Sequence, residues 1–268
     1  MIPKKIHYIW IDRSENPSYK LPKIYQMCMM STKLFNPDYE IILHTNKPIE
    51  WDLLRKEDFK VRFIERNLID EAISFGLPYN TQYFYVAHMS DWLRCNYLKE
   101  EGGIYLDTDI VITRSFDDLL DKHFIVAKEA GDAICAGVIL SEIDHPIIDK
   151  VLNTYRTDYH PREWVYNSQQ KPYEYMKQDS SVTIIEQKLG YHYPYIGEEK
   201  LYFAPCEKIE TPEDIKNYFM TRGHHLFGHI DDSPHLGAFE EAKDNNYIAQ
   251  LGKYILNRYG VVDKKEGE

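Results

Sequence analysis

The chain has 268 residues, 43% of them hydrophobic, and a formal net charge of −11 at pH 7. A chain of this length buries roughly three quarters of its unfolded surface, which suits one large α/β domain with insertions. The acidic balance argues against a nucleic-acid partner, because phosphate binding needs clustered Lys and Arg side chains. The four cysteines, Cys28, Cys95, Cys135 and Cys206, lack the spacing of a zinc site or a disulfide framework, so reduced thiols in a cytoplasm are expected.

The opening of the chain alternates between strand-like and helix-like patterns. Such alternation predicts a mainly parallel sheet whose ligand crevice lies at the carboxyl ends of the strands. The first apolar run contains His7 and is followed by Asp12, so it is too short for a signal peptide core or a membrane span. The predicted strands are residues 6–11, 40–44 and 61–64, and the predicted helices are residues 22–34 and 67–75.

A further helix is predicted before the middle of the chain. Apolar residues recur at helical spacing between residues 87 and 101, and Gly102-Gly103 is a suitable carboxyl-terminal stop. Asp91 and Arg94 are three residues apart and would be neighbours on one face of this helix. Taken alone, they would form an ordinary surface ion pair, worth a few tenths of a kcal/mol.

The most informative stretch is residues 102–109, in which an apolar run ends in two carboxylates separated by one residue. Side chains alternate across a strand, so Asp107 and Asp109 would point the same way if the strand continued through them. Two hard oxygen ligands at the end of a buried strand suit Mg²⁺ or Mn²⁺, which borrow further ligands from a substrate diphosphate. Acidic pairs also occur in solvated loops, so this interpretation depends on the surrounding sequence.

The later part of the chain changes character. Residues 155–205 are rich in Tyr and carry four prolines, which predicts an irregular, insertion-like region. Sugar rings stack on aromatic faces, so its aromatic residues are candidates for an acceptor groove, although they would equally suit packing against the sheet edge. Asp179 precedes an apolar run and has the character of a helix N-cap. The groove candidates are Trp164, Tyr173, Tyr191 and Tyr193, and the other predicted elements are strands at 110–113, 124–127 and 133–140 and a helix at 146–155.

The motifs together resemble a known family. Ser-Asp-x-x-Arg at residues 90–94, the helix, and Gly-Gly-Ile-Tyr-Leu-Asp-x-Asp at residues 102–109 resemble the DXD-containing glycosyltransferases of family 32. That family includes bacterial capsular-polysaccharide sugar transferases and yeast-type Golgi mannosyltransferases, and the glucosylating bacterial toxins are more distant relatives. The resemblance extends over residues 1 to about 150, with further support from residues 2–10, 36–41 and 115–120.

The resemblance implies a GT-A-type nucleotide-sugar-binding fold, a mainly parallel sheet flanked by helices, and a bound Mn²⁺ or Mg²⁺. The implied reaction moves a hexose, with retention of configuration, from a nucleotide sugar to an oligosaccharide, polysaccharide or glycolipid. A UDP-sugar is the first expectation for the donor, and GDP-mannose is the second. One catalytic domain is expected over residues 1–260, with the donor and metal core at 1–150, acceptor-side elements at 151–260 and a tail at 261–268.

The resemblance also implies roles for the residues of the two motifs. Asp109 would ligate the metal directly, and Asp107 would hold the ribose and reach the metal through water. Arg94 would approach the sugar or the diphosphate as a fixed guanidinium. Asp91 would then hydrogen-bond the hydroxyls of the donor sugar and orient its ring.

The nucleotide and sugar pockets have their own candidates. Trp10, at the end of the first strand, would be a platform for the nucleobase, with Ile9 beside it and Tyr105 in a similar position before the acidic pair. Ala136-Gly137 resembles the place where relatives put small residues beside the bound sugar. The alternatives are a core tryptophan and a strand glycine that allows close backbone approach.

A third metal ligand is expected near the end of the chain. Residues 222–229 resemble the family's second signature, a His-His pair followed by Gly-Ser-Trp, but the Ser and Trp are replaced here unless Ser233 fills that role. A neutral imidazole can ligate Mn²⁺ or another first-row metal. His225 is the first candidate, and His229 and His224 follow it.

Two other functions stay open. Residues 106–111 also fit the nucleophile loop of haloacid-dehalogenase-type phosphatases, in which Asp107 would attack phosphorus and Asp109 would act as the acid. That class places this loop near the amino terminus and needs later acidic residues, for which Asp231-Asp232 is available. The third function is an inactive sugar-binding module, because the altered late signature could signal lost chemistry.

The cellular setting follows from the lack of a leader-like sequence. The Golgi members of the family carry an amino-terminal anchor, and no such segment is recognisable in the opening residues. We therefore expect a cytoplasmic protein without a transmembrane segment. Peripheral attachment to a membrane through a lipid-linked acceptor is compatible with this expectation.

Overall fold

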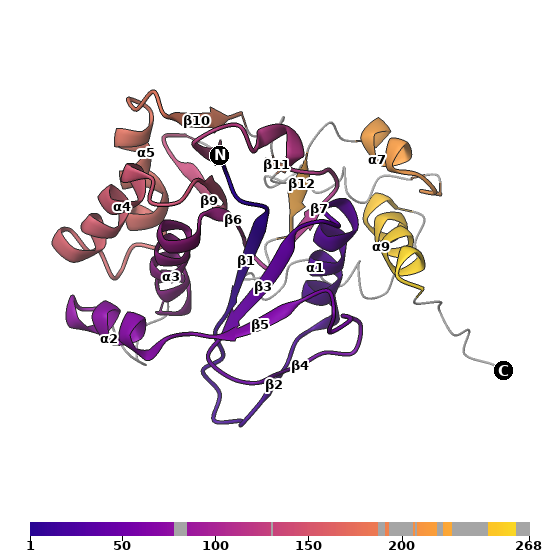
Figure 1. Cartoon of the computed structure of the whole chain (residues 1–268), viewed down its shortest axis with the longest axis horizontal. Helices are drawn as coiled ribbons and strands as arrows, with labels where there is room; N and C mark the ends of the chain where they lie inside the picture. Colours follow the sequence, from indigo (N-terminus) through magenta and orange to yellow (C-terminus); the bar gives the residue numbers. More distant parts are fainter. Residues whose placement is uncertain are drawn as a thin grey trace.

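The fold is described by a computed structural model, drawn in Figure 1. A seven-stranded sheet forms its centre. The structure describes residues 1–77, 85–129, 131–186, 191–192, 206, 208–218, 222–226 and 246–260. In spatial order, the strands of the central sheet are β10 (Val182–Ile185), β8 (Phe124–Lys128), β9 (Ile134–Ser141), β6 (Gly103–Leu106), β1 (Lys5–Trp10), β3 (Glu40–Thr45) and β5 (Lys60–Phe63).

Parallel pairing dominates this sheet. β1 pairs in parallel with both β3 and β6, β3 does so with β5, and β8 does so with β10. β9 runs antiparallel to its neighbours β6 and β8. The mainly parallel sheet predicted from the sequence is therefore confirmed. Because β1, β3 and β6 point the same way, their carboxyl ends share one edge, where Trp10 and Asp107 lie.

Alternate strand residues contribute to hydrophobic cores on opposite faces of the sheet. Ile104 and Leu106 of β6 belong to one core, whereas Tyr105 belongs to the other. Helices cover both faces, as Figure 1 shows. The helices of the first core are α1 (Lys23–Phe35), α7 (Pro212–Tyr218) and α9 (Tyr247–Arg258), and those of the second are α2 (Arg66–Ser74), α3 (Tyr85–Glu101), α4 (Pro146–Thr157) and α5 (Lys171–Met176).

A small sheet brings a late part of the chain to the centre of the molecule. Its middle strand runs antiparallel to the short strand that follows the acidic pair, with His225 opposite Ile110. The late His-His pair is thereby placed beside the Asp-x-Asp motif. This sheet contains β11 (Tyr191–His192), β12 (Gly223–His225) and β7 (Ile110–Ile112), and a further two-stranded sheet contains β2 (Tyr19–Lys20) and β4 (Ile49–Glu50).

Two glycines make the junction between α3 and β6. Gly102 has φ +61° and Gly103 has φ +98°, values that other residues rarely adopt. A Cβ on Gly103 would lie 2.5 Å from the carbonyl oxygen of Lys5 on the neighbouring strand. The helix can therefore enter the sheet directly next to β1 only because both positions are glycine.

Most of the predicted elements are found within one or two residues of their expected bounds, but residues 155–205 are not simply irregular. Their described part contains the π-helix η2 (Tyr166–Gln170), helix α5 and strand β10, which extends the central sheet. The N-cap expected at Asp179 is also wrong. Its Oδ1 accepts hydrogen bonds from the Ser181 amide (3.1 Å) and hydroxyl (2.6 Å), in a turn that begins a strand instead of a helix. An Asp carboxylate can accept such hydrogen bonds both at a helix N-cap and in a turn that precedes a strand.

Three molecule-wide expectations have different outcomes. All four cysteines are buried and free. Within the described residues, no helix combines the length and apolar character needed to traverse a bilayer. The division into residues 1–150 and 151–260 stays a prediction, and the expected tail at 261–268 lies outside the described residues.

Candidate active site

Asp107 and Asp109 lie on a turn between β6 and β7. β6 ends at Leu106, β7 begins at Ile110, and the Ile110 amide donates to the Asp107 carbonyl at 3.2 Å. One strand therefore does not continue through both carboxylates, in keeping with the separate strand predicted at 110–113. The turn, not the pleat of a strand, brings the two side chains to the same place.

Asp107, Asp109 and His225 form one cluster. Each offers a ligand atom, and the three atoms lie within 4.8 Å of one another. His225 Nε2 is 3.2 Å from Asp109 Oδ2, and the Leu226 amide donates to the Asp109 carbonyl at 2.9 Å. Burial disfavours the charged imidazole, but the Asp109 carboxylate outweighs it, so the pKa of His225 is raised. Two carboxylates and one imidazole are a donor set that suits a divalent first-row metal.

Arg94 is held beside this cluster by α3. Its Nη2 lies 2.9 Å from Asp91 Oδ1 and 3.5 Å from Asp107 Oδ1, and its Nη1 donates to the Ala136 carbonyl. The guanidinium lies 4.2 Å from the centre of the Tyr105 ring. Arg94 and Asp91 are only 5% and 6% exposed, so the interpretation as an ordinary surface pair is wrong. Burial raises the pKa of Asp91, an effect that Arg94 opposes.

Tyr105 fixes the orientation of Asp107. Its hydroxyl donates to Asp107 Oδ1 at 2.6 Å and lies 3.2 Å from the Ser90 hydroxyl. Tyr105 is itself buried, with 1% exposure. The Asp107 carboxylate is thus held by the phenol hydroxyl of Tyr105, two residues earlier in the chain, and by the Arg94 guanidinium.

Gly137 gives the Asp107 carboxylate its space. The Asp107 amide donates to the Gly137 carbonyl at 2.8 Å across the β6–β9 pair. A Cβ on Gly137 would lie 2.6 Å from Asp107 Oδ2, so any larger residue would displace the carboxylate. The close backbone approach considered from the sequence is found here, and contact of Ala136-Gly137 with a sugar stays a prediction.

Trp10 is part of an aromatic group at the end of β1. Its ring centre lies 5.2 Å from that of Tyr19 and 4.9 Å from that of Tyr25. Its indole Nε1 is buried and has no hydrogen-bond acceptor among the described residues. A buried donor without an acceptor is uncommon in folded proteins, and a ligand is one way to satisfy it.

One cleft of about 740 Å³ brings together most of the described candidates for the site. Of the other late histidines, His224 is buried with its Nε2 3.0 Å from the Tyr247 hydroxyl, and His229 lies outside the described residues. The sequence-derived candidates that line the cleft are Ile9, Trp10, Asp91, Arg94, Tyr105, Asp107, Asp109, Ala136, Gly137 and His225.

The cleft also contains residues that the sequence did not single out. Glu129 follows β8 at the carboxyl end of a sheet strand, a position that could have marked it. Ser168, Gln169 and Gln170 belong to η2 and had no sequence signal. Trp164 lines the cleft, as the groove hypothesis expected.

Of the other groove candidates, only Tyr173 has a described side chain. Tyr173 packs against the second hydrophobic core, with the Lys177 ammonium 5.1 Å from its ring centre, so its assignment to the groove is wrong. Tyr191 is described only as a backbone position of β11. Tyr193 lies outside the described residues.

Parts of this chain are similar in sequence to known proteins. Residues 22–125 match the sequence model of a family described as "Glycosyltransferase sugar-binding region containing DXD motif". The chain is 25% identical over 210 residues to glucan organizing enzyme 1 of Cryptococcus neoformans var. grubii, covering 72% of this chain and 55% of that protein. It is 29% identical over 155 residues to an uncharacterized glycosyltransferase of Acanthamoeba polyphaga mimivirus, covering 56% and 54%. Residues 22–125 are therefore similar to the sugar-binding region of the DXD-containing glycosyltransferases.

The relatives also set the extent of the likeness. The chain spans about half the length of these two curated relatives. Inositol phosphoceramide mannosyltransferase 2 of Schizosaccharomyces pombe is 25% identical over 152 residues, which are 57% of this chain and 38% of that protein. The finer assignment to family 32 stays a prediction.

Solved structures show the fold. The bifunctional glycosyltransferase WbbM superposes with a TM-score of 0.50 and 11% identity, over 94% of this chain and 52% of that one. The PaToxG glycosyltransferase gives a TM-score of 0.49 and 19% identity, over 66% and 69%. The GT-A glycosyltransferase fold expected from the sequence is confirmed by the WbbM match and the sheet order.

Proposed function

We propose that the protein is a metal-dependent, retaining glycosyltransferase that moves a hexose from a nucleotide sugar to a saccharide or glycolipid. A UDP-sugar is the first donor to test, and GDP-mannose is the second. The observation that carries the proposal is the cluster of Asp107, Asp109 and His225 on the wall of the cleft, beside the buried Arg94. The cleft is large enough for a nucleotide sugar.

Asp107, Asp109 and His225 would hold the cation, because their oxygen and nitrogen donors fit Mn²⁺ and converge within ligand distance. A bound cation would neutralise the negative charge that grows on the departing diphosphate. Tyr105 and Gly137 support this arrangement, since one fixes the Asp107 carboxylate and the other leaves room for it.

Arg94 would contribute a second positive charge. Asp91, the Ala136 carbonyl and the Tyr105 ring already hold the guanidinium in place, so little reorganisation is needed when charge develops on the substrate. Its remaining donors would bind diphosphate or sugar oxygens, and Asp91 would accept from sugar hydroxyls. The proton of the attacking acceptor hydroxyl would leave towards the departing diphosphate on the same face, which is what retention without a protein nucleophile requires.

Asp109→Ala tests the proposal. We expect nucleoside diphosphate release from a sugar nucleotide, in the presence of Mn²⁺, to fall about 100-fold or more, because one preorganised electrostatic stabiliser is lost. The measurement is a screen of UDP- and GDP-sugars with wild type and variant, and circular dichroism confirms that the variant is folded. The matched control is Asp121→Ala, whose carboxylate is 72% exposed and does not line the cleft.

Three results would contradict the proposal. They are undiminished turnover in Asp109→Ala, an equal loss in Asp121→Ala, and cleavage of a phosphomonoester without release of nucleoside diphosphate. The last result would favour the phosphatase hypothesis instead.

A further inference from the structure

A segment outside the motifs forms one wall of the cleft. Residues 158–170, which we call the wall segment, follow the end of α4 and end with the π-helix η2. A π-helical turn is uncommon and is often found at functional sites. The residues of this segment that line the cleft are Trp164, Val165, Ser168, Gln169 and Gln170.

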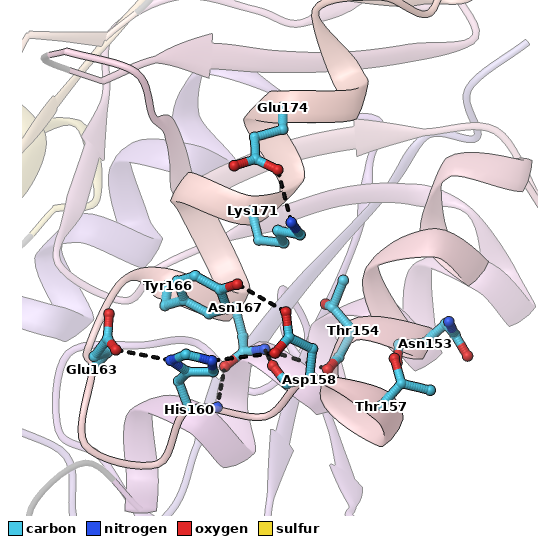
Figure 2. A network of polar contacts seen from close by, with 10 residues as sticks. All are labelled: Asn153, Thr154, Thr157, Asp158, His160, Glu163, Tyr166, Asn167, Lys171 and Glu174. Atoms are coloured by element: carbon cyan, nitrogen blue, oxygen red, sulfur yellow. Dashed lines mark hydrogen bonds and ion pairs between the residues drawn. The ribbon is translucent and has the colours of Figure 1, made fainter.

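Polar contacts hold the wall segment in one shape, as Figure 2 shows. Asp158 Oδ2 accepts from the Tyr166 hydroxyl at 2.8 Å, and Asp158 Oδ1 lies 3.2 Å from His160 Nε2. The other ring nitrogen of His160 is 2.8 Å from Glu163 Oε1. The His160 ring also stacks on Tyr166, with the ring centres 3.9 Å apart. We call Asp158, His160, Glu163 and Tyr166 the clasp.

Asn167 closes the same segment from within. Its Oδ1 accepts from the His160 amide at 2.9 Å, and its Nδ2 donates to the Asp158 carbonyl at 2.8 Å. Nδ2 also lies 3.4 Å from the Thr154 carbonyl of α4. Asn167 is 2% exposed. The start of η2 is therefore tied to the end of α4, which is packed on the second core.

The chemistry of the wall fits an uncharged sugar. Its cleft residues offer one indole face, one hydroxyl and two carboxamides, and none of them is charged. Indole faces and neutral amides are the groups that bind the ring and hydroxyls of a pyranose. Ser168 is buried, Trp164 and Gln169 are half-buried and Gln170 is exposed, so the wall leads from the interior to the open side of the cleft.

The charge of the cleft argues in the same direction. Glu129, Asp107 and Asp109 line it, and Arg94 is already paired with Asp91. Once the proposed cation offsets Asp107 and Asp109, Glu129 still adds negative charge to the lining, which repels an anionic acceptor headgroup but not a neutral saccharide.

We propose that the wall segment is the acceptor subsite, that it takes a neutral pyranose, and that the clasp positions it. This inference rests on the proposed glycosyltransferase function. Within it, Trp164 and Gln169 contact the acceptor ring. His160 is a positioning residue whose side chain acts through Asp158, Glu163 and Tyr166.

Kinetics with two substrates test the subsite. The probes are the UDP-hexose that the enzyme hydrolyses best and a set of methyl glucosides, galactosides and mannosides. We expect Trp164→Ala to raise the acceptor KM about tenfold, because a stacked aromatic is lost, without a comparable rise in the donor KM. His160→Gln should raise the acceptor KM severalfold, and Gln169→Ala should do the same with less risk to folding.

Lys171→Ala is the matched control. Lys171 lies directly after the wall segment and forms an exposed ion pair with Glu174 at 2.8 Å, but it takes no part in the clasp and does not line the cleft. Both KM values should stay at the wild-type level in this variant. An equal rise in the acceptor KM of Lys171→Ala would overturn the proposal. So would a rise in the donor KM of Trp164→Ala that matches the rise in its acceptor KM.

A binding measurement separates failure of the subsite from failure of the enzyme function. Saturation-transfer NMR of wild type with Mg²⁺ and UDP should detect binding of a methyl glycoside, and this signal should disappear in Trp164→Ala. Inositol 1-phosphate is the anionic probe, and it should bind wild type more weakly than the methyl glycoside does. No transfer to any glycoside, an unchanged signal in Trp164→Ala, or preference for inositol 1-phosphate would overturn the acceptor assignment. Failure of wild type to hydrolyse any sugar nucleotide would instead count against the proposed function.

Discussion

At the scale of single residues, the candidate site depends on how closely its parts fit. The Asp107 carboxylate is confined by Tyr105, Arg94 and the missing side chain of Gly137. Such confinement restricts the positions that the carboxylate oxygens can adopt. Substitutions next to the carboxylate should therefore affect the site as strongly as substitutions of the carboxylate itself.

Gly137→Ala is the sharpest test of this confinement. The added Cβ would lie 2.6 Å from Asp107 Oδ2, so we expect the carboxylate to turn away and Mn²⁺ affinity to fall about 10-fold or more. Isothermal titration with Mn²⁺ measures the change. The control is Gly131→Ala, where φ is +70° but no atom lies within 4 Å of the added Cβ. Gly131→Ala should lower the free energy of unfolding without changing Mn²⁺ affinity. Equal Mn²⁺ affinity in Gly137→Ala and Gly131→Ala would contradict the expectation.

The residues that sequence reasoning found are those whose chemistry is local to a motif. Asp107, Asp109 and Arg94 stand in short patterns with fixed spacing, and His225 stands in a histidine pair. Glu129 follows a predicted strand and could have been found from that position, whereas Gln169 reaches the cleft only through the packing of η2, which no short pattern encodes. The shared position of the two acidic side chains was predicted, but the sequence did not decide whether a strand or a turn creates it, because the pleat and a tight turn both bring alternate side chains together.

At the scale of elements, the junction of α3 with β6 carries the motif into the sheet. The elements with a clear period, such as α1, α4 and β9, were predictable to within one or two residues, because each buries one face or lies wholly in the core. β10 was missed although its four residues are all β-branched and favour a strand, because the Asp179 turn before it was interpreted as a helix N-cap.

Gly103→Ala should destabilise this junction. The backbone strain of φ +98° adds to the overlap with the Lys5 carbonyl, so we expect a loss of about 3 kcal/mol in the free energy of unfolding. Urea denaturation measures it. Gly76→Ala is the matched control, because φ is +100° and nothing lies within 4 Å of its Cβ. It should lose only about 1 kcal/mol, and similar losses in the two variants would show that the contact with Lys5 is unimportant.

At the scale of the whole molecule, the buried rings of His7 and His44 connect strands β1 and β3 to Gly102, at the start of the Asp-x-Asp motif. His7 Nε2 lies 3.0 Å from the Gly102 carbonyl, which can only accept, so Nε2 carries the hydrogen. His7 Nδ1 must then accept from His44 Nε2, at 3.0 Å. Burial lowers the pKa of His7 to about 4 and that of His44 to about 2. Both rings are therefore neutral in the folded protein at pH 7.

This pair predicts a loss of stability in acid. The unfolded chain binds protons on these histidines below about pH 6.5, and the folded chain does not until pH falls to about 4 for His7. Stability should therefore rise with pH between about 4 and 6.5, and His7 alone should cost about 2 kcal/mol at pH 5 relative to pH 7.5. Urea midpoints across this range measure the slope.

His44→Gln should reduce that slope, because one of the two neutral rings is removed. The control is His123→Gln, at a histidine that is 62% exposed. The same slope in wild type and His44→Gln would show that other groups govern the acid sensitivity. Comparison with the His123 variant distinguishes a buried ring from a general effect of losing a histidine.

The antiparallel pair of β12 with β7 has a consequence for the order in which the protein becomes competent. Asp109 and His225 are separated by 116 positions, and the Arg222 carbonyl and Leu226 amide join β12 to the residues around the acidic turn. Domains generally fold as units, and α9, which follows residue 225, packs into the first hydrophobic core. A nascent or clipped chain that stops before residue 225 would therefore lack both the His225 member of the acidic cluster and a helix of that core, so the proposed metal site would be complete only after the late strand has docked.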